Sequence, residues 1–296
     1  VYNELKEVYF FSVEVDDTTD ITQVSQCSVI VRYVNSLGLV VERFLGFYDV
    51  SEDRSSESLF NLLDNILDKF DYKKKLVGQC YDGASVMAGH LNGLQKKIKD
   101  KAPQALFVHC LAHRLNLVLQ QSFTNISKCR IFFCSIGGIP QFFHKSAKRT
   151  QALNLSSARR IPTIAQTRWS SNSKLLRVIV EDWDKLKSVF HQIIVDKTSD
   201  SHSVQQARGY LRDMNSFEYT FLAVVFHEIF SVTDILFDIL QKKSLDIRYC
   251  ISKIKNTTSI LKANRNEQFY KTLFEKAQKL TVITYTRNLG QEDIFN

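Results

Sequence analysis

The chain has 296 residues, 44% of them hydrophobic and 24% charged, with a formal net charge of +8 and only 3 Pro and 10 Gly. This composition is typical of a globular protein with enough apolar side chains for a sizeable core, and it excludes a disordered or low-complexity chain. The longest apolar runs are shorter than the roughly 20 residues that cross a bilayer, so we expect no membrane segment and no membrane partner.

The first part of the chain alternates between strand and helix patterns. Runs rich in β-branched and aromatic residues at 8–15, 27–33 and 40–48 predict three strands joined by short connections, which favours an antiparallel meander. Apolar residues at helical spacing predict a helix over 59–70, capped by Ser55 or Ser56. Short apolar runs at 76–81 and 106–109 then predict two more strands, the second followed by a helix over 111–119.

Beyond residue 120 the strand patterns fade, and a long apolar run over 217–240 predicts a helix. The predicted fold class is therefore α/β, with three antiparallel strands, then βαβ crossovers and a helical second half. The chain does not begin with Met and its first residues do not resemble a signal peptide, so we expect a piece of a longer protein. Six Cys without a CxxC pair indicate reduced thiols in a cytosolic or nuclear protein.

The charge is distributed unevenly. Residues 1–100 hold 11 Lys and Arg against 16 Asp and Glu, whereas 101–180 contain no acid at all, where the frequency in the whole chain would give about eight. That stretch carries twelve basic residues: Lys101, Arg114, Lys128, Arg130, Lys145, Lys148, Arg149, Arg159, Arg160, Arg168, Lys174 and Arg177. Because nearby carboxylates repel phosphates, we predict a DNA-binding surface that includes Arg159 and Arg160. A solvated basic face or an acidic protein partner would produce the same pattern.

Two acids follow predicted strands directly. Asp16 is expected to end the first strand, and Asp82 follows the fourth. If those strands are parallel neighbours, the two carboxylates meet at one sheet edge, where they could hold Mg²⁺ or Mn²⁺ through oxygen ligands. An Asp at a strand end is also a common turn residue or helix cap, so position alone leaves both interpretations open.

Four motifs in order make the chain similar to a known family. They are residues 11–22 (FSVEVDDTTDIT), 79–89 (QCYDGASVMAG), 109–117 (HCLAHRLNL) and 167–171 (TRWSS). Together they resemble the hAT transposase superfamily, closest to its domesticated, zinc finger MYM-type-like branch. The resemblance implies an RNase H-like core over 1–125 and a helical insertion region over 126–296. It also implies a nuclear, DNA-binding protein that self-associates in its full-length form.

The resemblance assigns roles to several residues. Asp16 and Asp82 correspond to the first two acids of the DDE set, which cuts and joins DNA strands with Mg²⁺ or Mn²⁺. Cys110 and His113 match the CxxH motif of the family; two ligands do not make a zinc site, so we expect packing there and no zinc. Arg168 and Trp169 match its RW motif, which suits phosphate pairing and base stacking, although a core Trp beside an exposed Arg fits equally well.

Two departures leave enzyme activity open. Thr18 stands where many active members have a Trp, and the third acid and the dimerisation segment are not found before Asn296. Glu218 and Glu228 lie on the long predicted helix, and neither is proposed as the third acid. The chain is therefore expected to derive from a DDE transposase, either still catalytic or kept as a non-catalytic protein that binds DNA or proteins in transcriptional regulation. An unrelated RNase H-like nuclease would not explain the helical half.

Overall fold

The computed structural model describes residues 1–19, 24–156, 158–162, 169–242 and 246–292. The chain forms two compact units, one of Val1–Leu115 with Gln241–Ser244 and one of Asn116–Leu240 with Leu245–Asn296. Below, the first is called the sheet unit and the second the helical unit. The boundary that we expect at residue 125 between core and insertion stays a prediction.

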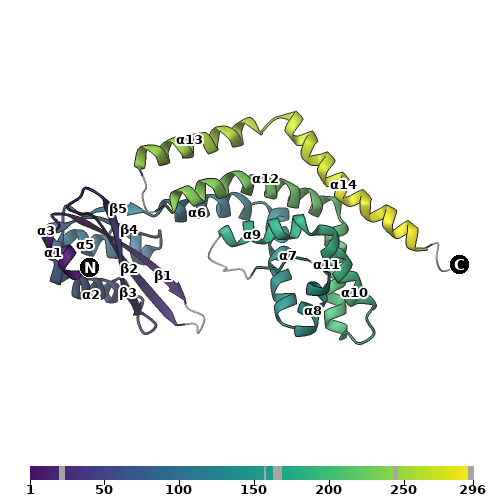
Figure 1. Ribbon diagram of the computed structural model, residues 1–296, viewed down its shortest axis with the longest axis horizontal. Helices are drawn as coiled ribbons and strands as arrows, with labels where there is room; N and C mark the ends of the chain where they lie inside the picture. Colours follow the sequence, from purple (N-terminus) through teal and green to yellow (C-terminus); the bar gives the residue numbers. More distant parts are fainter. Residues whose placement is uncertain (20–23, 157, 163–168, 243–245, 293–296) are drawn as a thin grey trace. The chain divides into compact units, whose positions relative to one another are not determined.

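A five-stranded sheet in the order β3-β2-β1-β4-β5 forms the centre of the sheet unit (Figure 1). The strands are β1 (Phe11–Thr19), β2 (Ser25–Val34), β3 (Val40–Asp49), β4 (Leu76–Tyr81) and β5 (Leu106–His109). β2 pairs antiparallel with both β1 and β3, whereas β4 pairs parallel with β1 and with β5. The predicted fold class, a mixed α/β sheet with three antiparallel strands and then crossovers, is confirmed.

The first strand differs from its prediction at both ends. It begins at Phe11 because the preceding residues form the short helix α1 (Tyr2–Glu7), whose Leu5 is fully buried. It also continues through the polar cluster to Thr19, because these residues pair one by one with β2 as far as Thr19↔Ser25. Asp16 therefore lies inside β1 and does not end it.

Helices cover one face of the sheet. They are α2 (Ser56–Leu67), the 3₁₀ turn η1 (Asp68–Phe70), α3 (Tyr72–Lys75), α4 (Ser85–Ala88) and α5 (Leu94–Lys101). Ser55 caps α2 by accepting a hydrogen bond from the Ser58 N–H at 3.2 Å, as predicted. Because strand side chains alternate, Phe11, Val13 and Val15 face the core under these helices.

The opposite face, here called the open face, carries the other half of each strand. From β1 it receives Ser12, Glu14 and Asp16, and from β4 and the residue after it Gly78, Cys80 and Asp82. Its apolar side chains remain exposed: Phe44 and Phe47 of β3 are 51% and 59% accessible, with their ring centroids 4.8 Å apart.

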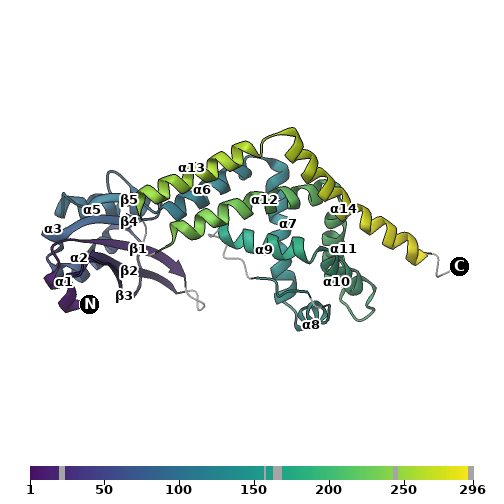
Figure 2. The same ribbon diagram turned by 45° about the horizontal axis from the view of Figure 1, so that its top comes forward.

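All of the described secondary structure of the helical unit is α-helical (Figure 2). They are α6 (Leu111–Thr124), which begins in the sheet unit, α7 (Ser127–His144), α8 (Ala147–Leu155), α9 (Trp169–Glu181), α10 (Trp183–Val195), α11 (Ser201–Asn215), α12 (Phe217–Leu240), α13 (Ile247–Ala263) and α14 (Glu267–Glu292). Their core is aromatic: Trp183 is 2% exposed, with its ring 6.3 Å from that of Tyr219. Trp183 is therefore a packing residue.

One helix among the described residues, α12, is long and apolar enough to cross a membrane by length and composition. Its buried residues, including Ala223, Phe226 and Phe230, belong to the core of the helical unit. A buried core helix of a folded domain can have the same length and composition, and α12 packs as such a helix.

Candidate functional site: two acids on neighbouring parallel strands

The register between β1 and β4 brings the two predicted acids to equivalent positions. The last recorded pair is Glu14↔Cys80. Two residues further along each parallel strand, on the same face, stand Asp16 and Asp82. The expected parallel adjacency of the two strands is confirmed, while shared binding of a cation by the two carboxylates stays a prediction.

The segment around Asp82 has a defined local structure. The Ala84 N–H donates to Asp82 Oδ1 at 3.0 Å, which tightens the turn after β4. Gly83 sits against His109: a Cβ there would lie 2.4 Å from His109 Cε1, so only glycine fits without displacing the ring. Burial, and then the charge of His113, lower the pKa of His109, which favours its neutral form.

The surroundings of Asp16 are acidic. Burial raises the pKa of Glu14, and the negative charges of Glu42 and Asp16 raise it further. The neighbouring Asp17 points to the other face of the strand, where it accepts a hydrogen bond from Arg54. The acid-rich part of the open face is therefore a place where a divalent cation would relieve like-charge repulsion.

These residues suit a cation only in part. Carboxylate oxygens are the ligands that Mg²⁺ prefers, and Asp16 and Asp82 would hold the ion. Within the residues that the structure describes, no group of three or more His, Cys, Asp or Glu is placed to hold a metal. Two carboxylates fit a single, weakly held ion better than the pair of ions that two-metal phosphoryl transfer requires.

The CxxH motif lies where β5 leads into α6. The Arg114 N–H donates to the Cys110 carbonyl at 2.9 Å, so Cys110 is the N-cap of α6. Cys80 on β4 lowers the pKa of the Cys110 thiol, and the ring of His113 lies 5.5 Å from that of His109. The motif thus joins β4, β5 and α6. No role for the Cys80 thiol is predicted from the sequence, because Cys110, its neighbour in the fold, is 30 residues further along the chain.

The predicted basic surface is wrong in one respect, because a stretch without acids in the sequence is not a surface without acids. Lys128 pairs with Glu218 at 2.9 Å and Lys148 with Asp196 at 2.5 Å. Arg159 forms an ion pair with Glu181. Acids that come later in the chain thus neutralise part of the stretch.

Other basic residues of the stretch keep their charge available. Arg130, Lys145 and Arg160 are exposed and have no ion pair among the described residues. Of the RW motif, Arg168 lies outside the described residues. Trp169 begins α9, and its side chain is likewise not described.

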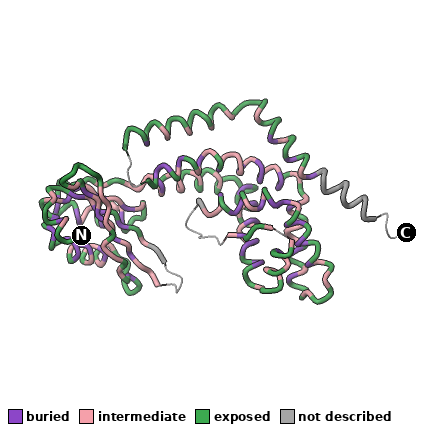
Figure 3. The backbone as a smooth tube through the Cα atoms, in the orientation of Figure 1, coloured by how far each residue is buried: buried purple, intermediate pink, exposed green. Residues whose placement is uncertain are grey.

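A basic helix went unnoticed in the sequence. α13 carries Arg248, Lys253, Lys255 and Lys262 and contains no acid. Figure 3 shows it exposed along most of its length. The signal was present as an acid-free run of 20 residues over 247–266, but this run is much shorter than 101–180 and acids stand on both sides of it.

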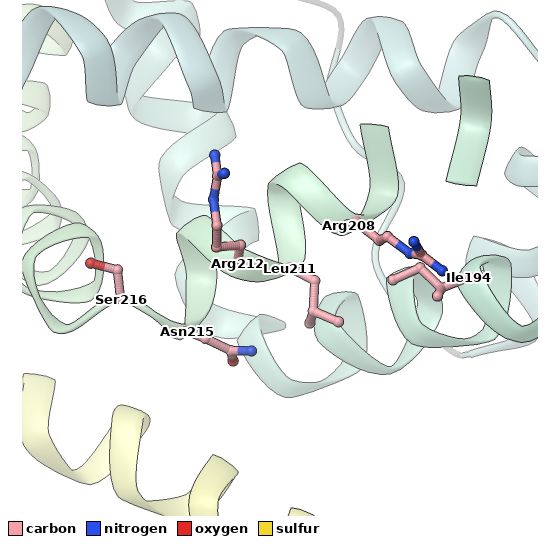
Figure 4. A pocket seen from close by; sticks show the side chains of 6 residues that line it. All are labelled: Ile194, Arg208, Leu211, Arg212, Asn215 and Ser216. Atoms are coloured by element: carbon pink, nitrogen blue, oxygen red, sulfur yellow. The ribbon is translucent and has the colours of Figure 1, made fainter. Parts of the chain in front are cut away.

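The helical unit also has a shallow hollow, shown in Figure 4. It is lined by Ile194, Arg208, Leu211, Arg212, Asn215 and Ser216, from α10, α11 and the residue after α11. Arg212 is partly neutralised by Asp213 at 3.5 Å. None of the predicted site residues lines it.

Similarities to known proteins support the family resemblance that the four motifs indicate. Residues 1–93 match a family described as the ZMYM1/FAM200, RNase-like domain. The 52 kDa repressor of the inhibitor of the protein kinase from Mus musculus is 22% identical over 293 residues, which cover 94% of this chain and 38% of the relative. A putative AC transposase from Zea mays is 25% identical over 188 residues, which cover 60% of this chain and 23% of the relative.

The sheet, the motifs and these matches define a transposase-related protein with an RNase H-like fold. Within that class the chain is related to the hAT transposases and to their domesticated derivatives, and its first 93 residues match the RNase-like domain of ZMYM1/FAM200. The chain spans 38% of the length of the repressor relatives from mouse and human.

Proposed function

We propose that this chain is part of a transposase-derived nuclear protein that binds DNA with little sequence preference. The observation that carries the proposal is α13, with four basic residues, no acid and an exposed surface. Arg130, Lys145 and Arg160 add exposed positive charge. Phosphate contacts by such side chains release counterions and give affinity without reading bases. Self-association belongs to the same proposal for the full-length protein.

The test is a titration of labelled duplex DNA with the 296-residue chain at several salt concentrations. With 6–10 phosphate contacts, affinity falls by roughly 10³ to 10⁵ between 50 and 200 mM salt. Binding that barely changes over this range, or that depends on one DNA sequence, would contradict the proposal.

We further propose that Asp16 and Asp82 hold one Mg²⁺ or Mn²⁺ weakly and that this chain alone does not cleave DNA. Mg²⁺ gives up water reluctantly, so two carboxylates leave a second ion poorly positioned. A misplacement of about 1 Å can cost on the order of a hundredfold in rate. Binding of Mn²⁺ should be measurable by the relaxation of water protons and should be weakened in Asp82→Asn.

The cleavage part is tested by nicking of supercoiled plasmid with Mg²⁺ or Mn²⁺, comparing the chain with its Asp82→Asn variant. No nicking by either protein is expected. Nicking that the substitution abolishes would show that a third acid is present. Glu218 and Glu228 would then be examined first, although they pair with Lys128 at 2.9 Å and with Lys276 at 2.6 Å.

A second candidate is binding of an acidic protein, as in a transcriptional regulator. It is favoured by the apolar residues of α13: Ile247 is 62% exposed and Ile251 47%. Substitution of both by Ser should leave affinity for DNA unchanged if DNA is the ligand. If an acidic protein is the ligand, the substitution should weaken a complex that a DNA competitor does not displace.

A further inference from the structure

Two thiols meet on the open face of the sheet unit. Cys80 on β4 lies opposite Val108 in the register with β5, and Cys110 follows two residues later on the same face. The two thiols are close enough that Cys80 lowers the pKa of Cys110 while Cys110 raises that of Cys80. Both residues are partly exposed.

The backbone holds Cys110 in this position. Its N–H donates to the Tyr81 carbonyl at 2.9 Å, and its carbonyl accepts the first hydrogen bond of α6 from Arg114 at 2.9 Å. As the N-cap of α6, Cys110 stands beside the backbone N–H groups of the first helical turn, which have no partner within the helix. Cys80 and the N–H groups at the start of α6 lower the pKa of Cys110 against the opposing effect of burial, as at other helix N-termini. Cys110 is therefore the more nucleophilic thiol.

We propose that Cys80 and Cys110 form an oxidisable dithiol that a peroxide converts to a disulfide. The Cys110 sulfur attacks one peroxide oxygen, the O–O bond breaks, and sulfenic acid and water form when the peroxide is H₂O₂. The Cys80 sulfur then attacks the Cys110 sulfur and displaces the hydroxyl, which leaves as a second water with the thiol proton. Two thiols are oxidised by two electrons, and one peroxide is reduced.

The test is a peptide map of the folded 296-residue chain after brief treatment with H₂O₂. Remaining thiols are blocked with N-ethylmaleimide under denaturing conditions, and the protein is digested with trypsin without reductant. We expect most of the oxidised Cys80 in a linked pair of peptides, residues 76–96 joined to 102–114. Reduction before digestion should release both peptides.

Matched variants separate this chemistry from general oxidation. Cys134, exposed on α7, is the control: Cys134→Ser should keep the link, whereas Cys80→Ser should lose it and leave Cys110 as a sulfenic acid trapped by dimedone. In urea the wild-type chain should lose its preference for this pair, which shows that the fold selects it.

The proposal is overturned if Cys80 and Cys110 stay free at peroxide concentrations that oxidise Cys134. It is also overturned if they pair mainly with other cysteines in the folded chain. Because these readouts come from the wild-type chain, misfolding of a variant does not affect them.

Discussion

Two acid-free stretches of this chain differ in what surrounds them. The stretch 101–180 is the longer, but Glu218, Asp196 and Glu181 from other elements pair with three of its basic residues. α13 is only 17 residues long, yet its basic side chains have no ion pair among the described residues. Absence of acids along the chain therefore predicts surface charge only where no other element packs against the stretch.

The largest expected effect concerns α13. Replacing Arg248, Lys253, Lys255 and Lys262 by Gln should weaken DNA binding on the order of a hundredfold at physiological salt, and the log–log salt slope should fall by about 3 to 4. Fluorescence anisotropy with labelled duplex measures both.

The matched control neutralises two paired residues, Lys128 and Lys148. Because each already has an acidic partner, their replacement by Gln should change the salt slope by less than about 1. If the control variant lowers the salt slope as much as the α13 variant does, ion pairing does not distinguish the two stretches.

A moderate effect is expected when a partner acid is removed. Glu181→Gln should release Arg159 and strengthen DNA binding by a few-fold, since one more phosphate contact adds roughly 0.9 to the salt slope. The same substitution combined with Arg159→Gln should return the affinity to near that of the wild type. Weaker binding by the single variant would count against a role for this region in DNA binding.

A smaller effect is expected at Glu14, which lies near the acidic side chains of Glu42 and Asp16. Its pKa is raised in the folded chain, first by burial, so the charged form destabilises the fold. Below the ordinary value of 4.5 both states are protonated and there is no penalty; the penalty appears above 4.5 and is complete once the pH exceeds the raised pKa. Glu14→Gln should therefore raise the Tm at pH 7 but not at pH 4. An equal rise at both pH values would point to packing instead.

The smallest effect is the ion pair between Lys128 and Glu218, whose side chains are 69% and 52% exposed. A double-mutant cycle on urea unfolding should give a coupling free energy of about 0.2–1 kcal/mol, which salt reduces. A coupling well above 1 kcal/mol would show that solvent screens this pair less than its exposure indicates.

Much of the fold was predictable from the sequence because periodicity reports local burial. The alternation in β2 and the helical spacing over α2 and α12 gave their places within a few residues. The short helix α1 was missed, because six residues hold too few positions for a helical pattern. The end of β1 was predicted too early, because a cluster of polar residues usually marks the end of a strand. Here, pairing with Ser25 and its neighbours keeps these residues extended.

The site was predictable only in part. Strand order and motif predict that Asp16 and Asp82 lie on neighbouring parallel strands, although Asp16 lies inside β1 and not at its end. The placement of Cys80 near Cys110 and the ion pair of Arg159 with Glu181 depend on contacts across the fold. No local pattern encodes such contacts.

The buried Trp183 gives the helical unit a spectroscopic signal that the sheet unit lacks. Both tryptophans of the chain, Trp169 and Trp183, belong to the helical unit, and residues 1–115 contain none. Intrinsic tryptophan fluorescence, excited at 295 nm to avoid tyrosine, therefore follows unfolding of the helical unit alone. Alkylation of the buried Cys27 reports opening of the sheet unit in the same sample. Two transitions with different midpoints would reveal units that unfold separately.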